Sequence, residues 1–173
     1  MEIRKWRMYG LVPYNISPIQ QAIQFGHSVV EYGLYANETQ GNTLKDYLDW
    51  ANNDKVFIIL NGGTTNKQPS IVTGDPSGTL NQHLLTLDRN GVPLSTFYEE
   101  DLGDQLTAIT FLVDERVFDK KKYPDFPEEI FHDPQMRMHD IEYKEYRYAK
   151  WLESVGGIQN AFLREFLSQF RLA

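Results

Sequence analysis

Three polar side chains have types and spacing that suit chemistry on a bound ligand. Asp101 lies in an acidic turn, residues 99–104, where a carboxylate can orient or deprotonate a water molecule. Gln24 and His27 are three residues apart in a stretch of helical periodicity, so they share a polar stripe of the predicted helix. These residues are the first candidates for a functional site.

A second group of candidates follows the apolar run 55–60. Gly62 and Gly63 predict a turn whose backbone N–H groups can hold a phosphate, although the spacing is not that of a P-loop. Ligands of open α/β sheets gather outside the carboxyl ends of the strands, so this loop should lie beside the end of the first strand. We expect five side chains to converge there, with Asp101 at the rim: Asn15, Gln20, Thr64, Thr65 and Asn66.

Each candidate also has a structural interpretation. His27 can be a packed helix histidine with Gln24 as its hydrogen-bonding neighbour, and Asp101 can be a solvated turn residue. Lysines 120–122 are typical of a solvated surface, or otherwise of a contact with nucleic acid or an acidic partner. His132 and His139 have suitable ligand chemistry but no rigid metal-site spacing, and tyrosines 143, 146 and 148 suit anchoring better than base stacking.

Composition excludes several classes of protein. The 173 residues suffice for one ordinary domain with a real core. With 24 acidic and 17 basic side chains the net charge is −7, which argues against a general nucleic-acid binder. The absence of cysteine excludes disulfides and thiol chemistry. No apolar run approaches a membrane span and the start has no apolar signal region, so we expect a cytoplasmic protein.

The first half of the chain predicts a strand, two helices and a second strand. Residues 6–12 read as a strand, and Ser17 and Pro18 are typical of a helix start. The helix over 19–35 has an apolar face, Ile19, Ile23 and Val30, at which Gly26 allows close approach. A shorter helix over 43–53 precedes the run 55–60, which predicts a central strand buried on both faces and joined by a right-handed crossover.

The second half predicts further regular structure and a C-terminal extension. After a loop over 61–77 we expect a helix over 80–90 and strands over 94–98 and 106–113. Residues 116–150 carry mixed charge and several prolines, which favours an extended arm with short helical pieces on the same domain. An amphipathic helix over 156–170 closes the chain. Its apolar residues are Phe162, Leu163, Phe166, Leu167 and Phe170.

The sequence around the first helix resembles the opening of the type II peptidyl-tRNA hydrolases. In that family a strand leads to a helix with the pattern Gly-Lys-x-Ala-Ala-Gln-x-x-His-Ala, and Gln24 and His27 match its Gln and His. The segment 90–93, Asn-Gly-Val-Pro, followed by 100–103, Glu-Asp-Leu-Gly, resembles the second signature, Gly-Ile/Leu-Pro and then Asp-Ala-Gly. Asp101 and Gly103 match its Asp and Gly. The resemblance covers roughly residues 6–115.

The resemblance implies an α/β fold with three layers, a four-stranded mixed sheet with helices on both faces, here followed by a helical extension over 116–173. It implies hydrolysis of the ester between a peptide and the 3′ ribose of tRNA, with no metal or organic cofactor. The site residues that it implies are Asp101, Gly103, Gln24 and His27. Compact members of this kind are typical of viral genomes, so a viral source is a hypothesis that the resemblance adds.

Several family positions differ in this chain. Gln20 stands where the family has its helix lysine, and residues 13–15, Pro-Tyr-Asn, stand where it has Arg-x-Asp. The threonine that follows the family glycine is absent, and the next hydroxyl is that of Thr107. A cation at such a site stabilises an oxyanion or a phosphate, whereas neutral Gln20 and Asn15 suit hydrogen-bonded recognition.

Three functions therefore remain open at the level of sequence. The first is a divergent peptidyl-tRNA hydrolase, or a hydrolase of a related nucleotide conjugate, with Asp101, Gln20 and Thr107 as the catalytic candidates. The second is a binding module of the same fold that holds a nucleotide-like ligand, an RNA end or a protein partner without turnover. The third is an assembly protein whose C-terminal helix docks on another chain, and a homodimer is one form of it.

Overall fold

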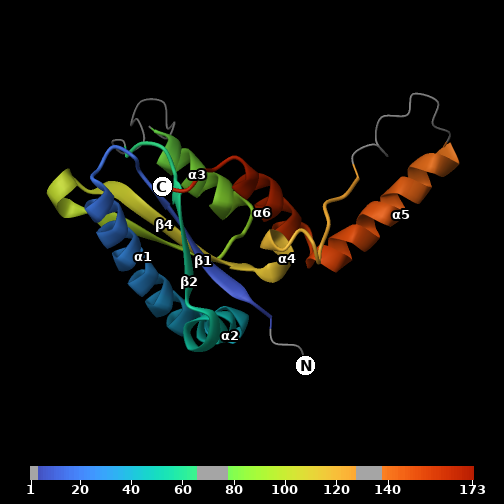
Figure 1. Cartoon of the computed structure of the whole chain (residues 1–173), viewed down its shortest axis with the longest axis horizontal. Helices are drawn as coiled ribbons and strands as arrows, with labels where there is room; N and C mark the ends of the chain where they lie inside the picture. Colours follow the sequence, from blue (N-terminus) through green and yellow to red (C-terminus); the bar gives the residue numbers. More distant parts are fainter. Residues whose placement is uncertain (1–3, 66–77, 128–137) are drawn as a thin grey trace. The chain divides into compact units, whose positions relative to one another are not determined.

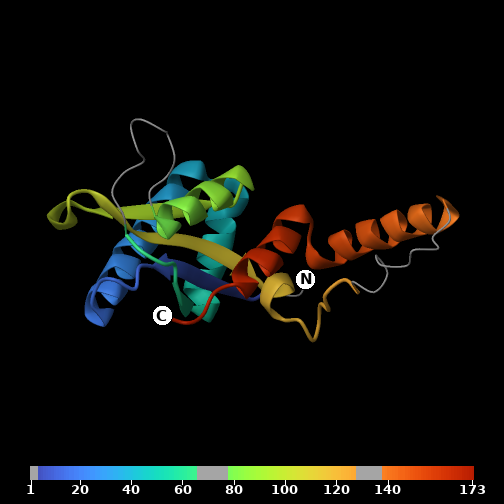
Figure 2. The same cartoon turned by 90° about the horizontal axis from the view of Figure 1, so that it is seen from above.

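The computed structural model describes residues 4–65, 78–127 and 138–173, and for 138–141 only the backbone. The chain divides into two compact units. Unit 1 comprises Met1–Asp114 together with Gln169–Ala173, and unit 2 comprises Glu115–Ser168. Figures 1 and 2 show the elements of both units, which are described separately below.

Unit 1 is built on a four-stranded mixed sheet, which confirms the predicted α/β fold. The strands are β1 (Trp6–Val12), β2 (Val56–Asn61), β3 (Leu94–Glu99) and β4 (Gln105–Asp114), in the order β2-β1-β4-β3. β1 pairs parallel with β2, as a crossover requires, and β4 runs antiparallel to both β1 and β3. β1 and β4 occupy the centre, and nearly every residue in them is buried.

Helices pack on both faces of this sheet. The even-numbered β1 residues Trp6, Met8 and Val12 share a core with α1 (Pro18–Thr39) and with Trp50, the first residue of a π-helical turn. That turn, Trp50–Asp54, continues α2 (Gly41–Asp49), so the helix predicted over 43–53 is found with a wider C-terminal turn. The odd-numbered Leu11 lies on the other face, beside Leu80 of α3 (Thr79–Arg89).

Gly10 fits the close approach of α1 to β1. A Cβ atom at this position would lie 2.2 Å from the Phe25 ring, well inside contact distance. A side chain here would therefore push α1 away from the sheet.

The prediction that the run 55–60 forms a central strand buried on both faces is wrong. β2 is an edge strand in which Val56 and Phe57 are exposed and Leu60 is buried. Its outer edge pairs with the C-terminal tail of the same unit: Asn61 N–H donates to the Arg171 carbonyl and Ala173 N–H to the Ile59 carbonyl, both at 3.0 Å. Covering an edge in this way satisfies its backbone groups, and a strand covered by its own chain can keep an apolar sequence.

The apolar face predicted for the first helix turns away from the sheet. Ser17 caps α1 and Pro18 occupies its first position, as predicted, but the residues of that helix that face the core are Gln24, Phe25, Ser28, Tyr32 and Ala36. The predicted face is exposed instead, with exposed fractions of 72% for Ile19, 49% for Ile23 and 62% for Val30. Aromatic and small side chains pack against the sheet because α1 approaches it closely at Gly10, and this leaves the β-branched residues outside.

Unit 2 contains α4 (Glu115–Phe118), α5 (Met138–Val155) and α6 (Ile158–Ser168). The extended arm predicted over 116–150 is therefore wrong from residue 138 onward, where an 18-residue helix forms. That stretch lacks internal Gly and Pro and is rich in good helix formers, which outweighs the mixed charge that favoured an arm. The predicted last helix is confirmed, with Leu163 and Phe166 buried.

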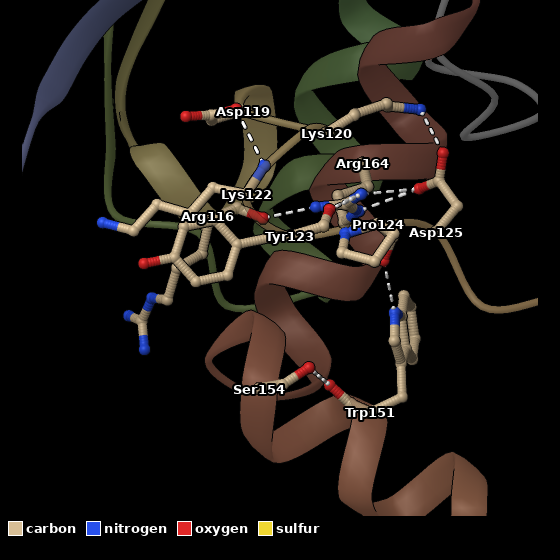
Figure 3. A network of polar contacts seen from close by, with 10 residues as sticks. All are labelled: Arg116, Asp119, Lys120, Lys122, Tyr123, Pro124, Asp125, Trp151, Ser154 and Arg164. Carbon is tan, nitrogen blue, oxygen red and sulfur yellow. Dashed lines mark hydrogen bonds and ion pairs between the residues drawn. The ribbon is translucent and has the colours of Figure 1, made fainter.

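A buried arginine holds unit 2 together (Figure 3). The Arg164 guanidinium donates to the carbonyls of Arg116 at 2.5 Å and Tyr123 at 2.7 Å, and to the Asp125 carboxylate at 2.7 and 3.0 Å. Although partial burial alone would raise the pKa of Asp125, hydrogen bonds from Lys120 and Arg164 outweigh it and lower that pKa. α6 is thereby tied to the segment that follows α4.

The lysines and tyrosines that the sequence analysis named in the C-terminal region lie in unit 2. Lys120 pairs with Asp125 at 2.8 Å and Lys122 with Glu115 at 3.6 Å, so two of the three lysines form internal ion pairs. Tyrosines 143, 146 and 148 lie on α5 with exposed side chains. His132, and the side chain of His139, fall outside the described residues.

Candidate functional site

Three strands of unit 1 end at the same side of the sheet. β1 and β2 run parallel, and β3 runs in their direction because both β1 and β3 are antiparallel to β4. The segments that follow these strands, 13–17, 61–65 and 99–104, therefore lie along one border, which we call the carboxyl border. α1 also begins there (Figure 1). This topology places the predicted candidates from three distant parts of the sequence along one border.

A hydrogen-bonded chain of three side chains links α1 to the last two strands at this border. The Thr107 hydroxyl of β4 donates to the Gln24 amide oxygen at 2.8 Å, and the Gln24 amide nitrogen donates to the Glu99 carboxylate at 2.5 Å. The Thr107 hydroxyl also lies 3.2 Å from the Phe97 carbonyl. Thr107 is fully buried, Gln24 nearly so, and Glu99 is half-buried. The chain thus leads from the core to a carboxylate that solvent can reach.

The neighbouring contacts hold this chain in place. Ser95 of β3 donates from its hydroxyl to the Ser28 carbonyl of α1 at 2.6 Å, one helical turn after Gln24. The His27 ring, also on α1, stacks on the Phe97 ring with centroids 4.5 Å apart. α1 and β3 are thus joined one helical turn after Gln24, which limits the movement of the helix that carries the amide. The His27 side chain is exposed.

Asp101 and Gly103 lie in the turn that continues β3. Asp101 is exposed within a short 3₁₀ helix, Glu100–Leu102, and its backbone N–H lies 3.4 Å from the Glu99 carboxylate. Gly103 has φ of +72°, a left-handed conformation that favours glycine and ends this turn. The acidic turn therefore presents two adjoining carboxylates, Glu99 and Asp101.

Asn15 and Thr65 meet as predicted, but in a closed pair. The Asn15 amide donates to the Thr65 hydroxyl at 3.1 Å, and the Thr65 N–H donates to the Asn15 amide oxygen at 3.0 Å. The pair joins the loop after β1 to the loop after β2.

The backbone N–H groups of the glycine loop, which the sequence suggested for a phosphate, have hydrogen-bond partners within the protein. The N–H groups of four consecutive residues, 62–65, all donate within the protein: to the Val12 carbonyl, the Asn61 amide oxygen, the Thr79 hydroxyl and the Asn15 amide oxygen. A phosphate would have to displace these bonds. Thr64 lies in this tied loop, and Asn66 lies outside the described residues.

Gln20 does not join the other candidates in a cluster of side chains. Its amide oxygen accepts from the Ser17 backbone N–H at 3.0 Å and from the Ser17 hydroxyl at 2.9 Å. Together with the return bond from Gln20 N–H to the Ser17 hydroxyl, this forms a capping box. The residue at the family's lysine position thus serves the helix end.

Glu99 belongs to the site and was not among the sequence candidates. The signal was present: Glu99 is the last residue of a strand and begins the acidic turn. Asp101 was the predicted candidate in this turn because it matches the Asp of the family's second signature. The half-buried position of Glu99 and its bond to Gln24 depend on tertiary contacts over 75 residues.

The described segments of the carboxyl border carry carboxylates and uncharged polar side chains, but no basic ones. Residues 13–24, 61–65 and 99–105 contain no lysine or arginine. Among the residues that the structure describes, no group of three or more metal-ligating side chains comes together. None of the described helices has the length and apolar character that a membrane crossing needs.

No protein-family model matches the chain, and the search of curated proteins returns no significant match. The candidate function therefore rests on the geometry above and on the motif resemblance.

Proposed function

We propose that this protein is a divergent peptidyl-tRNA hydrolase-like enzyme that cleaves the ester of a peptidyl-tRNA or a related nucleotide conjugate. The observation that carries the proposal is the Thr107–Gln24–Glu99 chain, which ends in an accessible carboxylate next to Asp101. Such an arrangement supports general-base chemistry, because a fixed carboxylate can orient and deprotonate a water. Since peptidyl-tRNA is a cytoplasmic substrate, the proposal includes a cytoplasmic location.

In this proposal each residue has a distinct role. Glu99 and Asp101 hold the attacking water, whose oxygen adds to the ester carbonyl. The bond between the carbonyl carbon and the ribose oxygen then breaks, and the ribose oxygen takes up the proton that the carboxylate removed from the water. Gln24 fixes the orientation of Glu99, and Thr107 positions Gln24 from the core without touching substrate. His27, exposed and stacked on Phe97, contacts the nucleotide part of the substrate.

A second candidate function is supported by the lack of positive charge. Because the described border segments carry no lysine or arginine, a phosphodiester gains no ion pair from them. Gln20, which replaces the family lysine, is held in the helix cap. This favours a module that binds a nucleotide-like ligand, an RNA end or a protein partner by hydrogen bonds and leaves it unchanged.

Single-turnover hydrolysis of an N-blocked aminoacyl-tRNA separates the two functions. We expect cleavage by the wild-type protein and a loss of at least about a hundredfold in Glu99→Gln and Asp101→Ala, the usual effect of removing a general base. Glu100→Gln is the matched control, since this carboxylate lies in the same turn with an exposed side chain.

Two results would count against the enzyme. Full activity of Asp101→Ala, or equal losses in Glu100→Gln, would remove the proposed mechanism. The absence of cleavage by a protein with a folded circular-dichroism spectrum would leave the binding module as the better proposal, and recovery of intact tRNA from the complex would support it.

A further inference from the structure

The carboxyl border receives a positive charge from a distant part of the chain. The C-terminal tail, Gln169–Ala173, belongs to unit 1 and pairs antiparallel with the outer edge of β2, with Leu172 opposite Leu60. In this register Arg171 lies opposite Asn61, and its carbonyl accepts the Asn61 N–H at 3.0 Å. Because Asn61 is the last residue of β2, Arg171 lies at the carboxyl border.

The packing of the tail fixes the face to which the Arg171 side chain projects. Successive side chains of a paired strand alternate between the two faces of a sheet. The Phe170 ring packs on the His83 ring of α3 with centroids 4.8 Å apart, so Phe170 lies on the α3 face. Arg171 therefore projects to the opposite face, which α1 covers. Its side chain is exposed, and none of the ion pairs within the described residues involves it.

Arg171 makes the charge along the border uneven. The acidic turn, residues 99–104, carries four carboxylates at the β3 end of the border. Arg171 lies at the other end, beyond β2, because the tail pairs with the edge strand of the order β2-β1-β4-β3. Four strand spacings separate the tail from β3, a distance of about 19 Å. A polyanion on this border is therefore repelled at the acidic turn and attracted at Arg171.

An exposed aromatic ring lies between these two ends. Tyr14 follows β1, which has β2 on one side and β4 on the other. Its N–H donates to the Gly63 carbonyl at 2.8 Å, and its side chain is 59% exposed. Nucleobases stack on such rings whatever their sequence. The border thus presents a cation, an aromatic ring and a pair of carboxylates in spatial order.

We infer that Arg171 binds a phosphate of the single-stranded 3′ end of the substrate RNA, with a base on Tyr14 and the terminal ester at Glu99 and Asp101. The inference rests on the proposed function for the identity of the substrate. A guanidinium suits this task, because its parallel N–H groups match the oxygens of a phosphate. Arg171 is then a binding residue that fixes which end of the RNA reaches the carboxylates, and it supplies the cation that the other border segments lack.

Fluorescence anisotropy of a short, labelled single-stranded RNA with the CCA end of tRNA tests this binding. We expect Arg171→Gln to weaken binding by about threefold to tenfold. The slope of log Kd against log salt concentration should fall by about 0.7, the value for one phosphate contact on a single strand. Arg171→Lys should keep the slope, because it keeps the charge. The substitutions leave the tail in place, since its pairing with β2 uses backbone groups.

Arg89→Gln is the matched control for the binding measurement. Arg89 is another exposed arginine of unit 1, but it ends α3. That helix begins at the border, where the Thr79 hydroxyl accepts the Thr64 N–H, so Arg89 lies about 15 Å away along the helix. Absence of RNA binding by the wild-type protein, an unchanged affinity and salt slope in Arg171→Gln, or an equal loss in Arg89→Gln would overturn the inference.

Single-turnover hydrolysis distinguishes failure of this inference from failure of the proposed function. Arg171→Gln should raise the protein concentration that gives half the maximal rate and leave the maximal rate unchanged, whereas Glu99→Gln should lower the maximal rate. A lower maximal rate in Arg171→Gln with unchanged half-saturation would overturn the inference and leave the hydrolysis standing. RNA binding that depends on Arg171, in a wild-type protein that does not cleave, would refute the hydrolysis and support the phosphate contact.

Discussion

Gln24 connects the core of unit 1 to its candidate site. Its amide oxygen accepts a hydrogen bond from the buried Thr107 hydroxyl, and its amide nitrogen donates one to the Glu99 carboxylate. These two bonds fix the orientation of the amide. A buried amide whose oxygen loses its donor suffers the full cost of desolvation. The geometry of Glu99 should therefore depend on a hydroxyl that no ligand can touch.

Removing the Thr107 hydroxyl tests this dependence. We expect Thr107→Val to lower the free energy of unfolding by about 1–3 kcal/mol, because the Gln24 oxygen is left buried without its donor. Urea denaturation measures the loss. Thr86→Val is the control, since that exposed hydroxyl donates to the Gln82 carbonyl within its own helix and should matter by less than about 0.5 kcal/mol. Equal effects of the two substitutions would contradict the role given to Thr107.

At the scale of elements, the start of α1 is specified by local chemistry. Ser17 and Gln20 satisfy each other's backbone groups in a capping box, and the Gln21 amide donates to the Pro13 carbonyl at 3.0 Å. These contacts involve neighbours in sequence, so the helix start was predictable from residue types. The cap also sets the position of Gln24, which lies on the second turn of the same helix.

Loss of the cap should destabilise α1. We expect Ser17→Ala to reduce the free energy of unfolding by about 1 kcal/mol, the usual value for an N-cap with a side-chain oxygen. Thermal unfolding followed by circular dichroism measures the change. Ser154→Ala provides the comparison, because that serine bonds the Trp151 carbonyl inside a helix and should contribute little (Figure 3). A neutral Ser17→Ala would mean that packing alone fixes the start of α1.

At the scale of the whole molecule, the chain forms two compact units with different sources of stability. Unit 1 has a continuous sheet core, whereas unit 2 depends on helix contacts and on the buried Arg164. A buried guanidinium group destabilises the fold unless its N–H groups have hydrogen-bond partners. Arg164 donates to two carbonyls and one carboxylate. Its loss leaves those acceptors without their donor.

Substituting Arg164 should therefore act on unit 2 specifically. We expect Arg164→Met to lower the stability of α6 by at least about 2 kcal/mol, from unsatisfied buried carbonyls. Amide hydrogen exchange is the measurement: exchange should accelerate in α6 and remain slow in β4. Arg147→Met, which removes an exposed arginine beside Tyr143, is the control and should leave both unchanged. Uniform acceleration across both units would show that they unfold together.

Local signals predicted most of the elements. Every strand and helix predicted for unit 1 is found near its predicted position, because turn residues, caps and periodicity act over a few residues. The π-helical end of α2 and the long α5 lacked a comparable signal. In α5 the prolines and mixed charge of the preceding residues favoured an arm, although the helix itself contains good helix formers.

The tertiary structure decided which faces and groups meet. The apolar face predicted for α1 and the first two residues of β2 are exposed although their sequences predicted burial, because periodicity identifies a face but not what covers it. In the same way, residue types nominated Gln24, Thr107 and the acidic turn, but only the strand order β2-β1-β4-β3 brings Glu99 to Gln24 across 75 residues. The caps, the turns and the strand and helix segments could be predicted from the amino-acid sequence, because they depend on neighbours along the chain. Burial, strand order and the joining of the site were decided by packing, because they depend on residues far apart in the chain.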